Sequence, residues 1–145
     1  MKIQSMILLF GAWLGVTGVQ ATTNDDARAL KATVTEFIAA GDAQDVDRLA
    51  AILHTDYRVI WNNPTDGKVS VIDRATYLDL IGKKVIGGDT RTVTFEEVSL
   101  IQGVNANIRA MSVGEKATFY HDFHLVKVAG TWTLVNDLFY MVPKG

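Results

Sequence analysis

The sequence of 145 residues contains no cysteine, which excludes disulfide bonds and a cysteine-linked lipid anchor. It also lacks an excess of positive charge, because 14 Lys and Arg residues stand against 16 Asp and Glu residues. Binding to the phosphates of a nucleic acid requires clustered basic charge, so a nucleic-acid partner is not expected. The N-terminal apolar run, Met6–Val16, is well short of the ~20 residues that a membrane-spanning helix needs.

The N-terminus has instead the pattern of a secretory signal. Met1-Lys2 gives a positive start, the apolar run follows, and Gly18–Ala21 ends in small residues suited to a signal peptidase. We therefore predict a signal peptide at residues 1–21, cleaved after Ala21, and a mature domain at residues 22–145. Removing Lys2 from the 14 basic residues leaves 13 against 16 acidic ones, a formal charge of −3. We expect a periplasmic or secreted protein with one core and no membrane contact after cleavage.

Apolar periodicity predicts helices in the first half and strands in the second. A first helix is expected to end near Ala40, and Asp45 and Asp73 are suited to cap a second and a third helix. Strands are predicted at 57–61, 68–72, 90–102, 104–113, 115–128 and 131–142. Helices followed by a long meander of strands indicate an α+β domain, with the helices on one face of a strongly bent sheet. A ligand pocket is expected between the two layers.

The last two strands form a predicted hairpin with Ala129-Gly130 as its turn. Counting outward from this turn places His124 opposite Val135 and Asp122 opposite Asp137. Two carboxylates directly opposite each other are unfavourable unless a proton, a cation or a ligand separates them. This pair is therefore the first candidate for a functional site.

The order of these elements resembles the nuclear transport factor 2-like (NTF2-like, SnoaL-like) superfamily. Phe37–Asp42, Asp45–Leu49 and Leu53–Tyr57 look like its opening, and Asp122–Lys127 with Gly130–Asn136 is similar to the closing hairpin of its "putative lumazine-binding" branch. The resemblance implies a cone-shaped fold, in which three helices of the N-terminal half pack on the concave face of a bent mixed or antiparallel sheet.

The superfamily contains enzymes and non-catalytic binders, so the resemblance alone does not decide the function. In the ketosteroid isomerase relatives, an acid that stabilises an oxyanion falls on Asp122. Trp61 stands where their catalytic base is expected, and Phe37 where their first-helix tyrosine is expected. With two of three groups replaced, the resemblance does not imply that isomerisation.

Polar and aromatic residues on one face of the predicted sheet form the candidate site. We predict that this face lines a cavity for a small, partly aromatic molecule. The candidate catalytic residues are Asp122, His124 and Asp137, and the candidate ligand-binding residues are Phe37, Tyr57, Val59, Trp61, Asn107, Arg109, Tyr120, Phe139 and Met141.

The opposite face, which carries Ile108, His121 and Phe123, is more apolar, and by patterning alone it could be the core instead. We favour the Asp122 face as the inner one, following the resemblance. The apolar face would then be free to pack against a second subunit, and we expect a homodimer.

Two further functions remain open at this stage. Asp122 with His124 and Asp137 has the parts of an acid–base enzyme such as a lyase, dehydratase or isomerase. The chain could also be a structural domain whose cavity is filled by its own side chains. His121 and His124 are three apart in a strand and point to opposite faces, so they cannot share a metal ion. Neutralisation of an acid by Arg109 is favoured over metal binding, and neither a metal nor a cofactor is predicted.

Overall fold

A computed structural model describes residues 18–145 of the chain. Its elements are α1 (Gly18–Ala43), α2 (Val46–Ile52), β1 (Leu53–Asn63), β2 (Lys68–Asp73), α3 (Arg74–Gly82), β3 (Thr92–Ile101), β4 (Asn105–Val113), β5 (Ala117–Val128) and β6 (Thr131–Pro143). Most of the predicted signal peptide lies outside the described residues and stays a prediction. No helix within residues 18–145 has both the length and the apolar character needed to cross a membrane.

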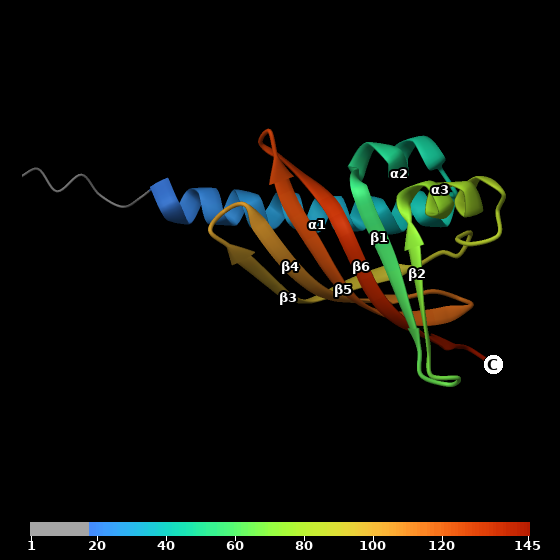
Figure 1. The fold of residues 1–145 in the computed structure, drawn as a ribbon. Coiled ribbons are helices and arrows are strands. Elements are labelled where there is room, and N and C mark those ends of the chain that lie inside the picture. Colours follow the sequence, from blue (N-terminus) through green and yellow to red (C-terminus); the bar gives the residue numbers. More distant parts are fainter. Residues whose placement is uncertain (1–17) are drawn as a thin grey trace, which may run out of the picture.

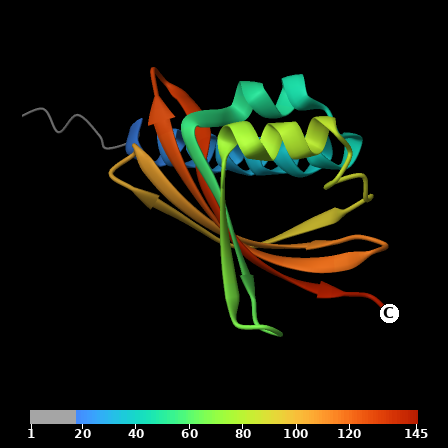
Figure 2. The same cartoon turned by 45° about the vertical axis from the view of Figure 1, so that its right-hand side comes forward.

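The six strands form one mixed sheet in the order β2-β1-β6-β5-β4-β3. All neighbouring strands are antiparallel except β1 and β6, which are parallel. The sheet is open and bent, and the three helices lie on its concave side (Figures 1 and 2). This confirms the predicted α+β fold, a cone closed by helices.

The two predicted helix caps are confirmed. The Asp45 carboxylate accepts a hydrogen bond from the backbone N–H of Arg48, and Asp73 accepts one from Thr76. The end of the first helix was predicted too early, because α1 continues past Gly41 to Ala43. Tertiary contacts outweigh the low helix propensity of glycine there, since the Gly41 carbonyl accepts a hydrogen bond from the N–H of Gly88, 3.2 Å away.

The hydrophobic core lies between the helices and the apolar face of β4, β5 and β6. Ile108, Phe123 and Leu134 are completely buried against residues of α1 such as Leu30. The prediction that the Asp122 face turns inward is therefore wrong, as is the prediction that the apolar face packs against a second subunit. Removing large aliphatic and aromatic side chains from water stabilises the fold far more than burying the polar face could.

A β-bulge in β6 explains why the predicted pair of acids does not form. The hairpin follows the predicted register from Val128 opposite Thr131 to Leu125 opposite Leu134, and then Val135 is left without a partner. From there Asp137 lies opposite Phe123, and Asp122 lies opposite Leu138. One extra residue turns every following side chain to the other face of the sheet, so the predicted pairing of Asp122 with Asp137 is wrong.

The turn between β4 and β5 is two residues longer than predicted. Arg109 is therefore paired with Asp122, and Asn107 with His124, rather than with Tyr120 and Asp122 as predicted. A shift by two residues keeps side chains on the same face. Asn107 and Arg109 consequently share the face of Asp122, as the sequence predicts, although their direct neighbours differ.

Asp26 near the start of the described chain ties α1 to the β5–β6 hairpin. Its Oδ1 atom accepts hydrogen bonds from Lys127 Nζ at 2.6 Å and from Trp132 Nε1 at 3.0 Å. The hydrogen bond from Lys127, and secondly that from Trp132, lowers the pKa of Asp26 below its ordinary value.

Candidate ligand-binding site

A cavity of about 470 Å³ lies between α1, α3 and the concave face of the sheet. This volume is within the range of small-molecule sites. Most of its wall is apolar, and the lining residues are Phe37, Gly41, Val59, Trp61, Ile72, Tyr77, Ile81, Ile86, Gly87, Asp89, Arg91, Lys116, Ala117, Phe119, His121, Asp137, Phe139, Met141 and Pro143.

The structure places the predicted site residues in two separate groups. Those on the cavity wall are Phe37, Val59, Trp61, Asp137, Phe139 and Met141. Tyr57 is fully buried beside the cavity, with its ring 5.5 Å from that of Tyr77 between centroids. Those on the outer face of the sheet are Asn107, Arg109, Tyr120, Asp122 and His124, none of which lines the cavity.

The outer group forms a partly exposed polar cluster. The Asn107 amide donates a hydrogen bond to Asp122, and Arg109 pairs with Glu97. His124 Nε2 lies 3.9 Å from Asp122 Oδ1, and these two side chains are 51% and 39% exposed. Asp122, His124 and Asp137 therefore do not meet, because the sheet separates the first two from the third.

Inside the cavity wall, Asp137 belongs to a buried network that the sequence did not predict. His121 Nδ1 lies 3.0 and 3.1 Å from the two carboxylate oxygens of Asp137, and His121 Nε2 lies 2.9 Å from Ser112 Oγ. All three residues are buried. The His121 ring is nearly parallel to that of Phe123, with centroids 4.7 Å apart. An isolated histidine in a run of alternating aromatic residues is the signal that could have identified this position.

The order of acid, histidine and serine resembles that of a hydrolytic triad, but the geometry does not support one. Ser112 has no exposed surface and does not line the cavity, so a bound molecule cannot reach its Oγ. Both ring nitrogens of His121 are engaged by buried partners. Asp137 is thus the member of the network that can still accept a hydrogen bond from the cavity. Across residues 18–145, no three His, Cys, Asp or Glu side chains gather to hold a metal ion.

Aromatic rings form the remaining wall. Trp61 and Phe139 come from neighbouring strands, and their rings are parallel within 3° with centroids 6.5 Å apart, a separation typical of offset packing. Burial, followed by the negative charge of Asp137, raises the pKa of Tyr77 far above its ordinary value. The Tyr77 hydroxyl therefore stays protonated and remains a hydrogen-bond donor on the wall.

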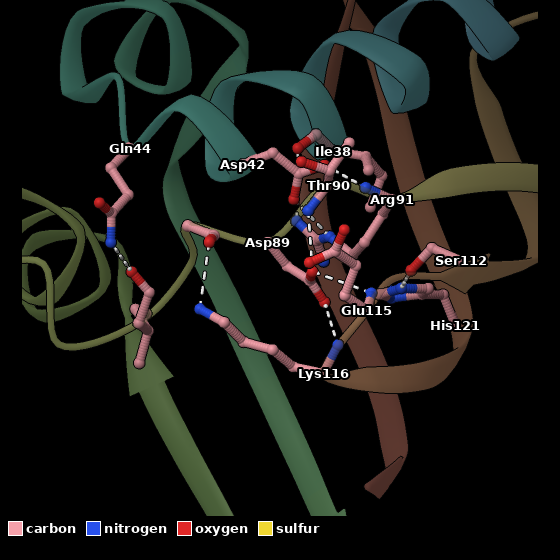
Figure 3. A network of polar contacts seen from close by, with 12 residues as sticks. Ile38, Asp42, Gln44, Asp89, Thr90, Arg91, Ser112, Glu115, Lys116 and His121 are labelled. Atoms are coloured by element: carbon pink, nitrogen blue, oxygen red, sulfur yellow. Dashed lines mark hydrogen bonds and ion pairs between the residues drawn. The ribbon is translucent and has the colours of Figure 1, made fainter. Parts of the chain in front are cut away.

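One rim of the cavity is held by a salt bridge between Arg91 and Asp42. Arg91 Nε lies 2.6 Å from Asp42 Oδ1, and the backbone N–H of Arg91 donates to Oδ2 at 2.8 Å (Figure 3). The Arg91 guanidinium also lies over the ring of Phe119, 5.2 Å from its centroid. This basic side chain is thereby fixed, and its charge is neutralised within the protein.

Asp89 fastens the same rim to the turn between β4 and β5. Its carboxylate accepts hydrogen bonds from the backbone N–H groups of Thr90, Glu115 and Lys116 (Figure 3). Burial alone would raise the pKa of Asp89, but these hydrogen bonds and the charge of Lys116 outweigh it, so the pKa is lowered. The Asp89 carboxylate therefore has a structural role, because it holds this part of the cavity wall to the turn between β4 and β5.

An open, bent sheet whose concave face is covered by three helices, with an apolar cavity between them, is the architecture of the NTF2-like fold. Solved structures with this fold are similar to the chain. An NTF2-like protein of unknown function from Shewanella baltica has 18% identity, covers 90% of this chain and 100% of its own, and has a TM-score of 0.72. A "putative scytalone dehydratase" from Novosphingobium aromaticivorans has 16% identity, coverage of 85% and 88%, and a TM-score of 0.68. A ketosteroid isomerase-like protein from Erwinia carotovora has 15% identity, coverage of 82% and 98%, and a TM-score of 0.67.

The sequence assigns the chain to one family. Residues 25–140 match the family described as "Putative lumazine-binding", and the chain belongs to that family. No curated protein sequence matches the chain. At the identities given above, the structural similarities establish the fold alone.

Proposed function

We propose that this protein binds a flat, partly aromatic small molecule in the cavity between the helices and the sheet. The observation that carries the proposal is the cavity itself, which has aromatic walls and one buried carboxylate, Asp137, among its lining residues. Apolar walls with a few fixed polar groups are typical of sites that recognise small molecules. The family description makes lumazine, a flat heteroaromatic dione, the first ligand to test.

The role of the aromatic wall can be tested by calorimetric titration of the purified protein with lumazine. Trp61→Ala removes one of the two parallel rings, and we expect it to weaken binding about tenfold to a hundredfold, since each factor of ten corresponds to about 1.4 kcal/mol. Phe95→Ala is the matched control, because Phe95 is a partly buried aromatic residue that does not line the cavity. Equal affinities of Trp61→Ala and the wild type would contradict the proposed site.

A second candidate function is acid–base catalysis, and the position of Asp137 favours it. This carboxylate lines the cavity and is bonded to His121, an arrangement that suits proton transfer. Of the predicted catalytic residues, Asp137 is the one that this candidate retains. The test is the exchange of the α-protons of 2-tetralone in D₂O, followed by NMR. Catalysis predicts acceleration that Asp137→Asn abolishes and Asp122→Asn does not, whereas a binding protein gives no acceleration.

We also propose that the protein is exported, which rests on the sequence pattern of residues 1–21. Cell fractionation and N-terminal sequencing of the mature protein test this. We expect an N-terminus at Thr22 in the exported fraction. Recovery of the protein in the cytoplasm with Met1 intact would refute it.

Finally, we propose that a second copy of the chain covers the outer face of β5 and β6. Tyr120, Leu138 and Tyr140 are exposed there, and the first and last of these stack with centroids 4.7 Å apart. Exposed apolar patches of this kind mark interaction surfaces. Sedimentation equilibrium should show a dimer for the wild type and a monomer for Leu138→Glu. A monomeric wild type would refute the proposal.

A further inference from the structure

The buried carboxylate in the cavity specifies the chemistry of the ligand's inner edge. We infer that this edge carries a neutral hydrogen-bond donor, a ring N–H of the lactam or imide type, and that Asp137 accepts it. The inference rests on the proposed function, because it concerns the same cavity. It adds a requirement that the aromatic walls alone do not impose.

The hydrogen bonds of Asp137 leave acceptor capacity open. A carboxylate has about four lone-pair sites, yet both oxygens of Asp137 approach the same atom, His121 Nδ1, at 3.0 and 3.1 Å. Within residues 18–145 no other side chain or backbone N–H donates to it. The residue is only 2% exposed and lines the cavity, so a molecule in the cavity is well placed to supply the missing donor.

The neighbouring residues fix the orientation of this acceptor. His121 cannot turn away, because its Nε2 atom is bonded to Ser112 and its ring stacks against Phe123. The Ser112 hydroxyl can either donate to a neutral His121 or accept from a protonated one. The network is therefore satisfied in both protonation states, and in both of them the spare acceptor sites belong to Asp137.

A neutral donor fits this site better than the alternatives. A ligand that presents only acceptors would leave the spare acceptor sites of the buried carboxylate unsatisfied, and sites with buried polar groups discriminate strongly against such analogues. A cationic ligand would have to lose its hydration shell to reach the buried carboxylate through a mostly apolar cavity, and the attraction between the two charges offsets that cost only where the geometry is excellent. The protonated Tyr77 hydroxyl on the wall can donate to a carbonyl, so a ring with N–H beside C=O matches both groups.

Lumazine and 1,3-dimethyllumazine test the inference, because they differ in whether the two ring nitrogens of the dione carry hydrogen or methyl. Titration calorimetry with the wild-type protein should show about tenfold to hundredfold tighter binding of lumazine. Asp137→Leu removes both carboxylate oxygens, so no acceptor is left for the ligand's N–H, whichever tautomer His121 adopts. The preference for lumazine should then disappear, while Asp122→Asn should keep it.

The outcomes separate the inference from the proposed function. Equal binding of the two compounds by the wild type overturns the inference and leaves the proposed function standing. A preference that persists in Asp137→Leu also overturns the inference, because it would then reflect the bulk of the methyl groups. Failure of the wild type to bind either compound counts against both. The wild-type comparison requires no variant, so it tests the inference even if Asp137→Leu folds poorly.

Discussion

Replacement of His121 by phenylalanine tests whether the buried network contributes to stability through its polar contacts. The ring of the new side chain can keep the stacking against Phe119 and Phe123, whose planes lie within 14° of that of His121. What is lost are the hydrogen bonds to Asp137 and Ser112, both almost fully buried. His121→Phe therefore separates the polar role of the residue from its packing.

The expected loss is large because it leaves a buried carboxylate without its donor. Leaving a buried polar group without its hydrogen-bond partner typically costs about 1–3 kcal/mol, and more where the group is charged, as a carboxylate is. The free energy of unfolding of a domain is about 5–15 kcal/mol, so His121→Phe should lower it by a substantial fraction.

Urea denaturation at pH 7 measures this loss, and the chain provides a matched control. His124→Phe changes the same residue type three positions along the same strand, where the side chain is 51% exposed, so its effect should be within about 0.5 kcal/mol. Adding Asp137→Leu and Ser112→Ala to His121→Phe should recover much of the loss, because apolar replacement of a whole buried polar network is often tolerated. A loss below about 1 kcal/mol for His121→Phe alone would refute the reasoning.

Two further predictions concern other parts of the fold. Asp26→Asn should destabilise the protein at pH 7, and its difference from the wild type should shrink as the pH falls below about 4. The reason is that a carboxyl whose folded pKa is lowered by the hydrogen bond from Lys127 contributes its full stability above the unfolded pKa and loses it as the pH falls through the folded pKa. Urea midpoints from pH 3 to 7 check this, with the exposed Asp25→Asn as control. Gly87→Ala should lower the free energy of unfolding more than Gly103→Ala. Both glycines have positive φ (79° and 70°), but only at Gly87 does an added Cβ meet a carbonyl oxygen of α1, 2.4 Å away. Thermal unfolding of the two variants measures the difference, and equal losses would show that the loop accommodates the clash.

The elements of the fold could be predicted because their signals are local. Asp45 and Asp73 cap helices through hydrogen bonds to residues three positions later, which the sequence displays directly. Gly103 and Gly130 both have positive φ at the turns where they were expected. The alternation of apolar residues predicted the strands, and the structure confirms each of them within a few residues.

The composition of the candidate site was predicted only in part, because its inner face depends on long-range packing. Phe37, Trp61 and Phe139 are on the cavity wall, but His121 was assigned to the opposite face from the ligand. The bulge at Val135 has no local signal, since valine is a common strand residue and no glycine or proline marks the position. A register counted from the turn cannot detect an extra residue that only the packing of both faces requires.

The bulge has a consequence for the site that extends beyond the hairpin. The parallel strand β1 also changes its register against β6 at this level, where residues 54–57 of β1 stand against the single residue Val135 of β6. Beyond it, Val59 is paired with Asp137, and Trp61 with Phe139. The same bulge that brings Asp137 beside His121 therefore also turns Phe139 onto the cavity wall, beside Trp61 of β1. The polar and the aromatic parts of the candidate site depend on one feature of β6, and a change in its register would remove both from the cavity together.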